Sequence, residues 1–276
     1  MLHAINPLVD FVFKRLFGAP ENLDLLCSLL NGLLQPRVPI VELALLNPYT
    51  ESEFQGDGRT VVDVKARDAD GWTFQVEVQA MVRARLIPRM LYSAVDLYQS
   101  QLSEGQDYST LRPVVALWIL DGVLFRESTG WHHRFELWDP GKNLRMTDHL
   151  QIHTVELPRW RPEEALDDGA RWVYFLREAR NWKVLPEVLR TPELEKAMAV
   201  LNRISQKQVD YLQYQARQNF LREERAREAE TERALADEKK AWAAAEQALA
   251  AKARAEGDAA AMRARLRALG LEPDEA

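Results

Sequence analysis

The chain contains very little cysteine: Cys27 is the single one among its 276 residues. One thiol cannot form an internal disulfide, and it cannot supply a metal site built from several cysteines. Long apolar runs are also missing, because the longest, from Val114 to Leu120, suits a buried strand and is far too short for a membrane span. The first residues lack a basic leader and are interrupted by Asp10, unlike a secretion signal. We therefore expect a protein of the reducing cytoplasm.

An excess of positive charge is absent as well. The chain has 36 Lys and Arg against 42 Asp and Glu, a formal net charge of −6. Domains that bind nucleic acid through bulk positive charge are usually strongly basic, so that class is disfavoured. An enzyme that approaches phosphate groups with a bound cation and a local arginine cluster remains compatible with this balance.

Apolar spacing divides the chain into three segments. Residues 1–160 predict a compact core of helices and strands, residues 161–204 a helical extension, and residues 205–276 a long, charged, alanine-rich helical arm with a frayed tail. The elements expected before the arm are helices over 6–18 (capped by Asn6) and 20–34, a strand over 40–46, a hairpin over 61–79, a helix over 83–105, strands over 112–122, 132–139 and 151–158, and helices near 163–181 and 192–203.

The hairpin over 61–79 is predicted to have one apolar and one polar face, because apolar and polar residues alternate strictly over 72–79. A three-residue loop with Gly71 in the left-handed conformation places Asp63 directly opposite Glu77, with Cβ atoms roughly 5 Å apart. A two-residue loop would put them on opposite faces. The alternation favours the first register, since it alone stacks both apolar sets on the same side.

Two facing carboxylates within reach of one ion indicate a Mg²⁺ site, which Mn²⁺ could also occupy. The backbone carbonyl of Val78 offers a third oxygen beside Glu77, and Gln79 projects from the same face, where it could orient an attacking water. The alternative interpretation of Asp63 and Glu77 is a solvated polar sheet face. The helix and the two-sided buried strand that follow favour a covered sheet instead.

Several stretches in this order resemble the recombination-promoting nuclease/transposase family of the PD-(D/E)XK nuclease superfamily. They are "DFVFKRLFG", "LLCSLLNGLL", "VDVKARDADGWTFQVEVQ" and "RMLYSAVDLYQSQLSEGQDYSTLRPVVALWIL". The resemblance covers roughly residues 5–125, with thinner likeness to about residue 180. It implies an α/β fold with an αβββαβ core, a mixed sheet flanked by helices, and the activity of a metal-dependent DNA endonuclease.

Carried over to this chain, the resemblance matches Asp63 and Glu77 to the acidic motif residues and Gln79 to the final position. Many members of the superfamily have lysine there, whereas this family commonly has glutamine. Val62 stands where the motif has proline, a common departure. Asp10 matches an acidic residue that assists the metal, although an ion pair with Lys14, four residues later, is the other interpretation.

Other polar residues remain open. Lys65, Arg83, Arg85 and Arg89 are candidates for contact with the DNA backbone or, equally, solvated charges; Lys65 could also pair with Glu77. The three histidines His132, His133 and His153 lack a metal-ligand spacing, and we expect them on strand surfaces.

Leu235, Trp242 and Leu249 recur every seven residues in the arm, a weak coiled-coil pattern that indicates a homodimer or higher homo-oligomer. The favoured hypothesis is a Mg²⁺-dependent DNA endonuclease. The alternative is a catalytically inactive, nuclease-derived DNA-binding or scaffold protein that oligomerises through this helix. Transposition proper is a third possibility, but no end-recognition element is evident.

Overall fold

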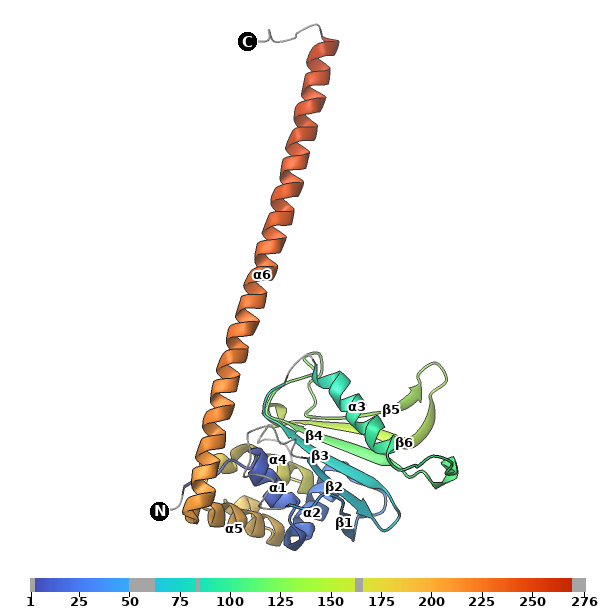
Figure 1. The fold of residues 1–276 in the computed structure, drawn as a ribbon, viewed down its shortest axis with the longest axis vertical. Coiled ribbons are helices and arrows are strands. Elements are labelled where there is room, and N and C mark those ends of the chain that lie inside the picture. The colour runs from blue at the N-terminus through green and yellow to red at the C-terminus, as the bar shows by residue number, and fades with distance from the viewer. Residues whose placement is uncertain (1–2, 50–62, 83–84, 162–165, 270–276) are drawn as a thin grey trace. The chain divides into compact units, whose positions relative to one another are not determined.

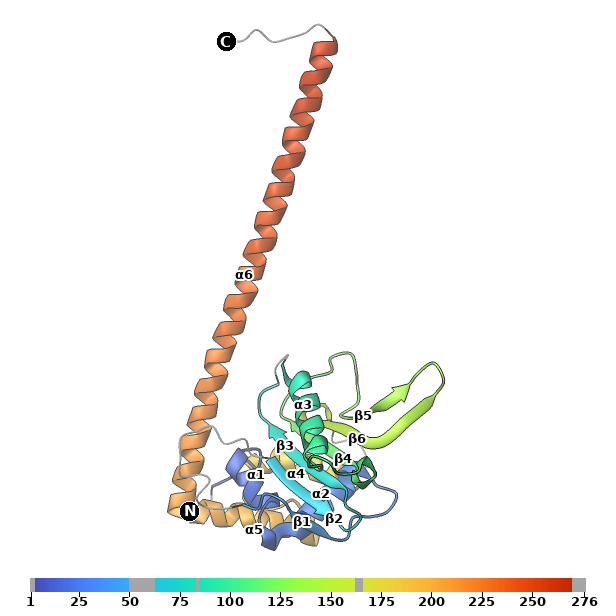
Figure 2. The ribbon, with the colours of Figure 1, turned by 45° about the vertical axis from the view of Figure 1, so that its right-hand side comes forward.

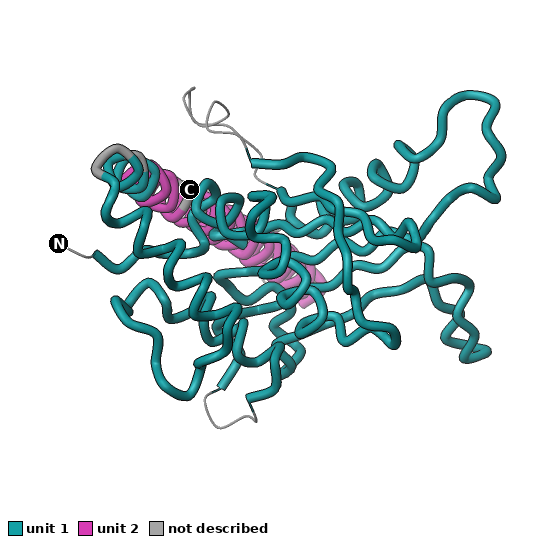
Figure 3. The backbone as a smooth tube through the Cα atoms, turned by 90° about the horizontal axis from the view of Figure 1, so that it is seen from below, with its two compact units in different colours: residues 1–218 teal, residues 219–276 magenta. Residues whose placement is uncertain are grey.

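The computed structural model describes residues 3–49, 63–82, 85–161 and 166–269. It comprises two compact units, residues 1–218 and residues 219–276 (Figure 3). The three-part division expected from the sequence stays a prediction.

A six-stranded mixed sheet forms the centre of the first unit, in the order β1-β2-β3-β4-β6-β5. Its strands are β1 (Leu43–Leu45), β2 (Asp63–Asp68), β3 (Thr73–Gln79), β4 (Val114–Leu120), β5 (His132–Asp139) and β6 (Leu144–Glu156). β4 runs parallel to both neighbours, β3 and β6, and the other pairs are antiparallel. Every residue of β4 is buried, as its unbroken apolar sequence predicts for a strand covered on both faces.

Helices cover the two faces unequally (Figures 1 and 2). One face carries the main core, to which α1 (Asp10–Phe17), α2 (Leu23–Leu34), α4 (Asp168–Glu178) and α5 (Pro192–Gln206) contribute. The other face carries α3 (Leu86–Gln99), whose Leu86, Met90 and Ala94 pack on Ala116, Trp118 and Leu120 of β4. The order α2-β1-β2-β3-α3-β4 is the αβββαβ core expected from the sequence, so the predicted fold class is confirmed.

Several expected boundaries were wrong, among them the start of β6, which is Leu144 and not residue 151. α1 begins at Asp10, and Asn6 instead accepts the Leu8 amide through Oδ1 in a preceding turn. β1 is only three residues long, because Asn31 takes both backbone groups of Ile40: its Nδ2 donates to the carbonyl and its Oδ1 accepts from the amide, each at 2.8 Å. α3 ends at Gln99, where apolar periodicity stops, and does not reach residue 105.

Among the described residues, β6 is the longest strand and α6 the longest helix. β6 continues beyond its pairing with β4, and its first residues pair with β5 in a two-stranded ribbon (Figure 2). α6 (Gln208–Ala268) is a continuous helix of 61 residues, as the composition predicted, and it passes through Gly257 without a break. No helix among the described residues has the length and apolar character needed to cross a bilayer. The tail expected to fray, after residue 270, lies outside the described residues.

Candidate active site

The β2–β3 hairpin has the register expected from its alternation. Asp63 is the direct partner of Glu77, and Gly71 in the turn adopts a φ of 88°, in the left-handed region. Oδ1 of Asp68 accepts the Trp72 amide at 2.8 Å and helps to close the turn. The predicted three-residue loop is therefore confirmed, and both acidic residues project from the same face.

The two carboxylates meet at the side chain of Gln75. Its Nε2 lies 3.1 Å from Oδ2 of Asp63 and 2.8 Å from Oε1 of Glu77. The hydroxyl of Ser93, on α3, lies 2.8 Å from the same nitrogen. Asp63 is 8% exposed and Glu77 4% exposed, so this is not a solvated sheet face. α3 covers the polar face and brings its own polar residues to the acidic pair.

Basic side chains accompany each carboxylate. Nζ of Lys65 lies 3.2 Å from Oδ2 of Asp63, so the recorded partner of Lys65 is Asp63 rather than Glu77. Nη2 of Arg89 lies 2.8 Å from Oε2 of Glu77, and its Nη1 donates to Oε1 of Gln79 at 3.3 Å. The guanidinium also lies over the Trp118 ring, 5.3 Å from the centroid. Arg89 thus joins two residues of the predicted motif.

Glu77 holds its proton more tightly than an ordinary glutamate. Burial raises its pKa from 4.5 to about 7, because the charged form loses its water. Arg89 opposes this shift and the Asp63 charge adds to it, while Ser93 and Lys65 favour ionisation. A perturbed carboxyl group beside a second carboxylate is typical of a functional site.

The donors here fit a hard divalent cation. The Gln75 amide group, whose N–H hydrogens are partly positive, already lies between two carboxylate oxygens, so a cation that displaced it would meet both. The Val78 carbonyl follows Glu77 in β3, and the Gln79 side chain shares the face of Glu77. No group of three or more His, Cys, Asp or Glu side chains in the described ranges could share one ion. Backbone, water and phosphate oxygens would have to complete the coordination.

Asp10, which lies in α1, contacts residues other than the acidic pair. Its carboxylate forms an ion pair with Arg217 of α6, and its Oδ1 accepts the Phe11 amide. The ion pair with Lys14 that the sequence suggested stays a prediction. Assistance to the metal by Asp10 stays a prediction, and it would compete with Arg217.

The four candidates for DNA contact separate in the structure. Lys65 and Arg89 pair with the acidic residues, as described above. Arg85 is exposed at the N-terminal end of α3, and Arg83 lies outside the described residues. Contact of any of them with DNA stays a prediction.

The expectation that the histidines lie on strand surfaces is wrong for His153 and holds only in part for His132 and His133, which are half-buried. His153 is 2% exposed, and its Nδ1 lies 2.9 Å from Nε2 of His132. Burial, together with neighbouring positive charge, lowers the pKa of His132 to about 4 and that of His153 to about 3. His133 is partly buried, with its Nε2 2.7 Å from the Ser128 hydroxyl. Sequence alternation could not reveal this burial, because it depends on β5 folding beside β6.

Sequence reasoning missed three residues that hold the acidic pair. Gln75 and Ser93 bridge the carboxylates, and Asn47 donates from Nδ2 to Oδ1 of Asp63 at 3.0 Å. The sequence pattern could have indicated two of them, Gln75 and Ser93. Gln75 belongs to the same alternating set as Glu77, and Ser93 follows Arg89 by four residues, which places both on one helix face. Nothing local indicated Asn47, because it lies 16 residues before Asp63 in the sequence.

Comparison with known families finds a match over most of the chain. The model of the PD-(D/E)XK nuclease family transposase matches residues 7–242, farther along the chain than the likeness to about residue 180 seen in the sequence. Neither the curated proteins nor the solved structures give a match.

Proposed function

Because the chain belongs to the PD-(D/E)XK nuclease transposase family, we propose that it is a metal-dependent DNA endonuclease that uses Mg²⁺ or Mn²⁺. The observation that carries this proposal is the meeting of Asp63 and Glu77 at one point on the covered sheet face. Family membership supports a nuclease-type function, and the paired carboxylates supply the oxygen donors that such a cation prefers.

Each residue has a proposed role. Asp63, Glu77 and the Val78 carbonyl would hold the cation, with Asp10 as an assisting acid. A divalent cation bound there would polarise the scissile phosphate and favour ionisation of the attacking water. Gln79 would orient that water through its amide, whose oxygen Arg89 already fixes at 3.3 Å. Lys65 would offset phosphate charge beside Asp63. The reaction is hydrolysis of a phosphodiester bond.

A covalently closed supercoiled plasmid tests this proposal, because a molecule without ends is relaxed only by internal cleavage. We expect the full chain to nick it with Mg²⁺ or Mn²⁺, and a chelator to stop the reaction. Asp63→Ala should lower the rate by about a hundredfold or more, as expected when a metal ligand is lost. Asp96→Ala is the matched control, because Asp96 is an exposed acid on α3. Equal nicking by wild type and Asp63→Ala would refute the site.

A second candidate function is DNA binding or scaffolding without cleavage. Lys65, Gln75 and Arg89 form ion pairs or hydrogen bonds with the two carboxylates. Such contacts are also compatible with a nuclease fold that has lost its catalytic activity. Retardation of duplex DNA in a gel, with no nicking at any Mg²⁺ or Mn²⁺ concentration, would favour this candidate. Strand-transfer products would instead favour transposition.

A further inference from the structure

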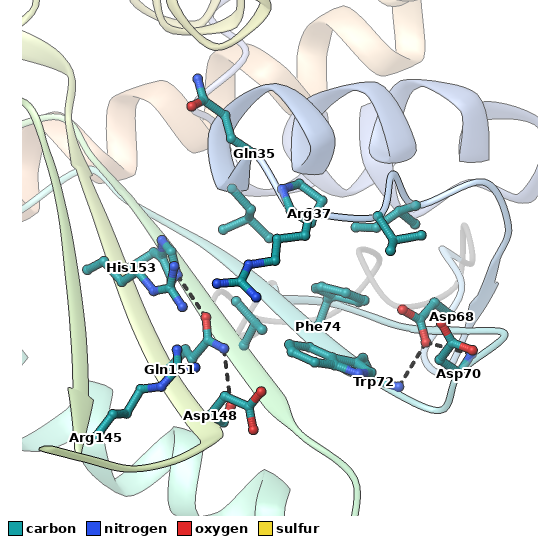
Figure 4. Close-up of a pocket in the computed structure, with 16 residues that line it drawn as sticks. Gln35, Arg37, Asp68, Asp70, Trp72, Phe74, Arg145, Asp148, Gln151 and His153 are labelled. Atoms are coloured by element: carbon teal, nitrogen blue, oxygen red, sulfur yellow. Dashed lines mark hydrogen bonds between the residues drawn. The ribbon is translucent and has the colours of Figure 1, made fainter. Parts of the chain in front are cut away.

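A second site lies on the sheet face opposite the acidic pair. It is a cavity of about 370 Å³, within the range of small-molecule sites in proteins. Phe74 and Val115 of the main core line it, and the loop after α2 forms one wall (Figure 4). None of its lining residues belongs to the proposed nuclease site.

One end of the cavity is basic. Arg134 and Arg145 both pair with the same carboxylate oxygen, Oε1 of Glu136. Arg37 has no hydrogen-bond or ion-pair partner within the described part of the chain, and its guanidinium points into the cavity (Figure 4). Asp148 also lines this end, and the other two carboxylates of the lining, those of Asp68 and Asp70, lie beside Trp72 at the opposite end (Figure 4). The Arg37 guanidinium suits an anion with several oxygens, because guanidinium forks bind phosphate in a bidentate manner.

The wall that carries Arg37 is held in place. Gln35 ends α2 with a φ of 46°, and the two hydrogen bonds from Asn31 to Ile40 close the loop between them. The opposite wall carries two buried polar side chains, Gln151 at 5% and His153 at 2% exposure. These features describe a preformed site rather than a chance gap between side chains.

The other end of the cavity is aromatic and acidic. Trp72 and Phe74 line it beside the β2–β3 turn, and β4 separates them from the arginines of β5 and β6. Asp68 lies at this end, opposite Arg145 in Figure 4. Its Oδ1 accepts the amides of Asp70 and Trp72, and the Gly71 amide also acts on this carboxylate. That end therefore offers a stacking surface and an acceptor for N–H groups.

We infer that this cavity binds a nucleoside monophosphate unit. Its phosphate would lie against Arg37 and its base on Trp72 and Phe74, with a base N–H directed to Asp68. A phosphate alone would leave the aromatic end unused, and a neutral nucleoside would leave the arginines without an anion. The unit could be a free nucleotide or the 5′-phosphorylated end of a DNA strand, which share this chemistry.

Calorimetric titration of the full chain with AMP tests the inference. We expect AMP to bind about tenfold more tightly than adenosine or inorganic phosphate, since each of these lacks one half of the contacts. Arg37→Ala should weaken AMP binding by about tenfold, the value of one lost charge-assisted contact. Arg126→Ala, which changes another exposed arginine that does not line the cavity, should bind AMP as wild type does.

Further titrations show whether the ligand is a free nucleotide or a DNA end, and whether this site works independently of the proposed nuclease site. A 5′-phosphorylated DNA hexamer that binds in an Arg37-dependent manner, when AMP does not, would assign the cavity to strand ends. Asp63→Ala should retain AMP binding, because Asp63 does not line the cavity. AMP binding would therefore support this inference even if the protein did not cleave DNA. The inference would be overturned if neither AMP nor the hexamer bound at millimolar concentration, or if Arg37→Ala and Arg126→Ala bound them equally well. It would also be overturned if inorganic phosphate bound as tightly as AMP.

Discussion

At the scale of single residues, Glu77 is a group whose ionisation the fold opposes. Its pKa rises from 4.5 in the unfolded chain to about 7 in the folded protein. A raised folded pKa contributes stability that is fully present below 4.5 and is lost as the pH rises through about 7. The same carboxyl must lose its proton to bind a cation, so cation binding should strengthen as the pH rises through this window.

We predict that Glu77→Gln flattens the dependence of stability on pH. Between about pH 5 and about pH 8, the unfolding free energy of the wild type should fall relative to that of the variant by up to about 3 kcal/mol. Urea unfolding at several pH values measures the difference. Glu104→Gln, an exposed glutamate after α3, is the control and should follow the wild type. A Glu77→Gln profile parallel to that of the wild type would show that Glu77 titrates normally.

At the scale of elements, the β2–β3 turn determines whether the acidic pair can form. Gly71 has a φ of 88°, and a Cβ added there would also lie 3.0 Å from Cγ of Arg112. We predict that Gly71→Ala destabilises the protein by about 1–2 kcal/mol, through backbone strain in the left-handed region. Thermal unfolding measures this loss, and nicking activity reports whether the pair stays aligned.

Gly130→Ala is the matched control for this change. A Cβ at Gly130 would meet no atom closer than 3.8 Å, and its φ lies outside the left-handed region. Its effect on stability should therefore be small. Equal losses from the two substitutions would mean that the turn does not depend on the conformation of Gly71.

The same hairpin shows how far sequence could predict this site. The side-chain period of two and the position of Gly71 determined the register that brings Asp63 opposite Glu77, because both are local properties of the chain. The contacts of Arg89 and Ser93 with the pair depend on how α3 packs across β4, and apolar periodicity does not define that packing. The cavity on the other face needed the same long-range information, since Arg37, Trp72 and His153 come from three separate segments.

At the scale of the whole molecule, α6 presents exposed apolar residues that a lone helix does not need. Leu235, Trp242 and Leu249 are 60%, 72% and 69% exposed and recur every seven residues. A helix that is otherwise polar gains little stability from such residues unless another helix covers them. We therefore predict that the full chain is a homodimer or higher homo-oligomer, and that these residues lie at the interface.

A truncation after Gln218 tests this prediction and keeps the first compact unit intact. It retains the first turns of α6, whose Asp210 and Arg217 pair with Arg15 and Asp10 of α1. Analytical ultracentrifugation should give a smaller number of subunits per particle for residues 1–218 than for the full chain. Trp242→Ser should weaken the full-length oligomer, whereas Glu238→Ser, an exposed polar position on the same helix, should not. An unchanged number of subunits after truncation would place the interface in the first unit, and the seven-residue spacing would then have no role in assembly.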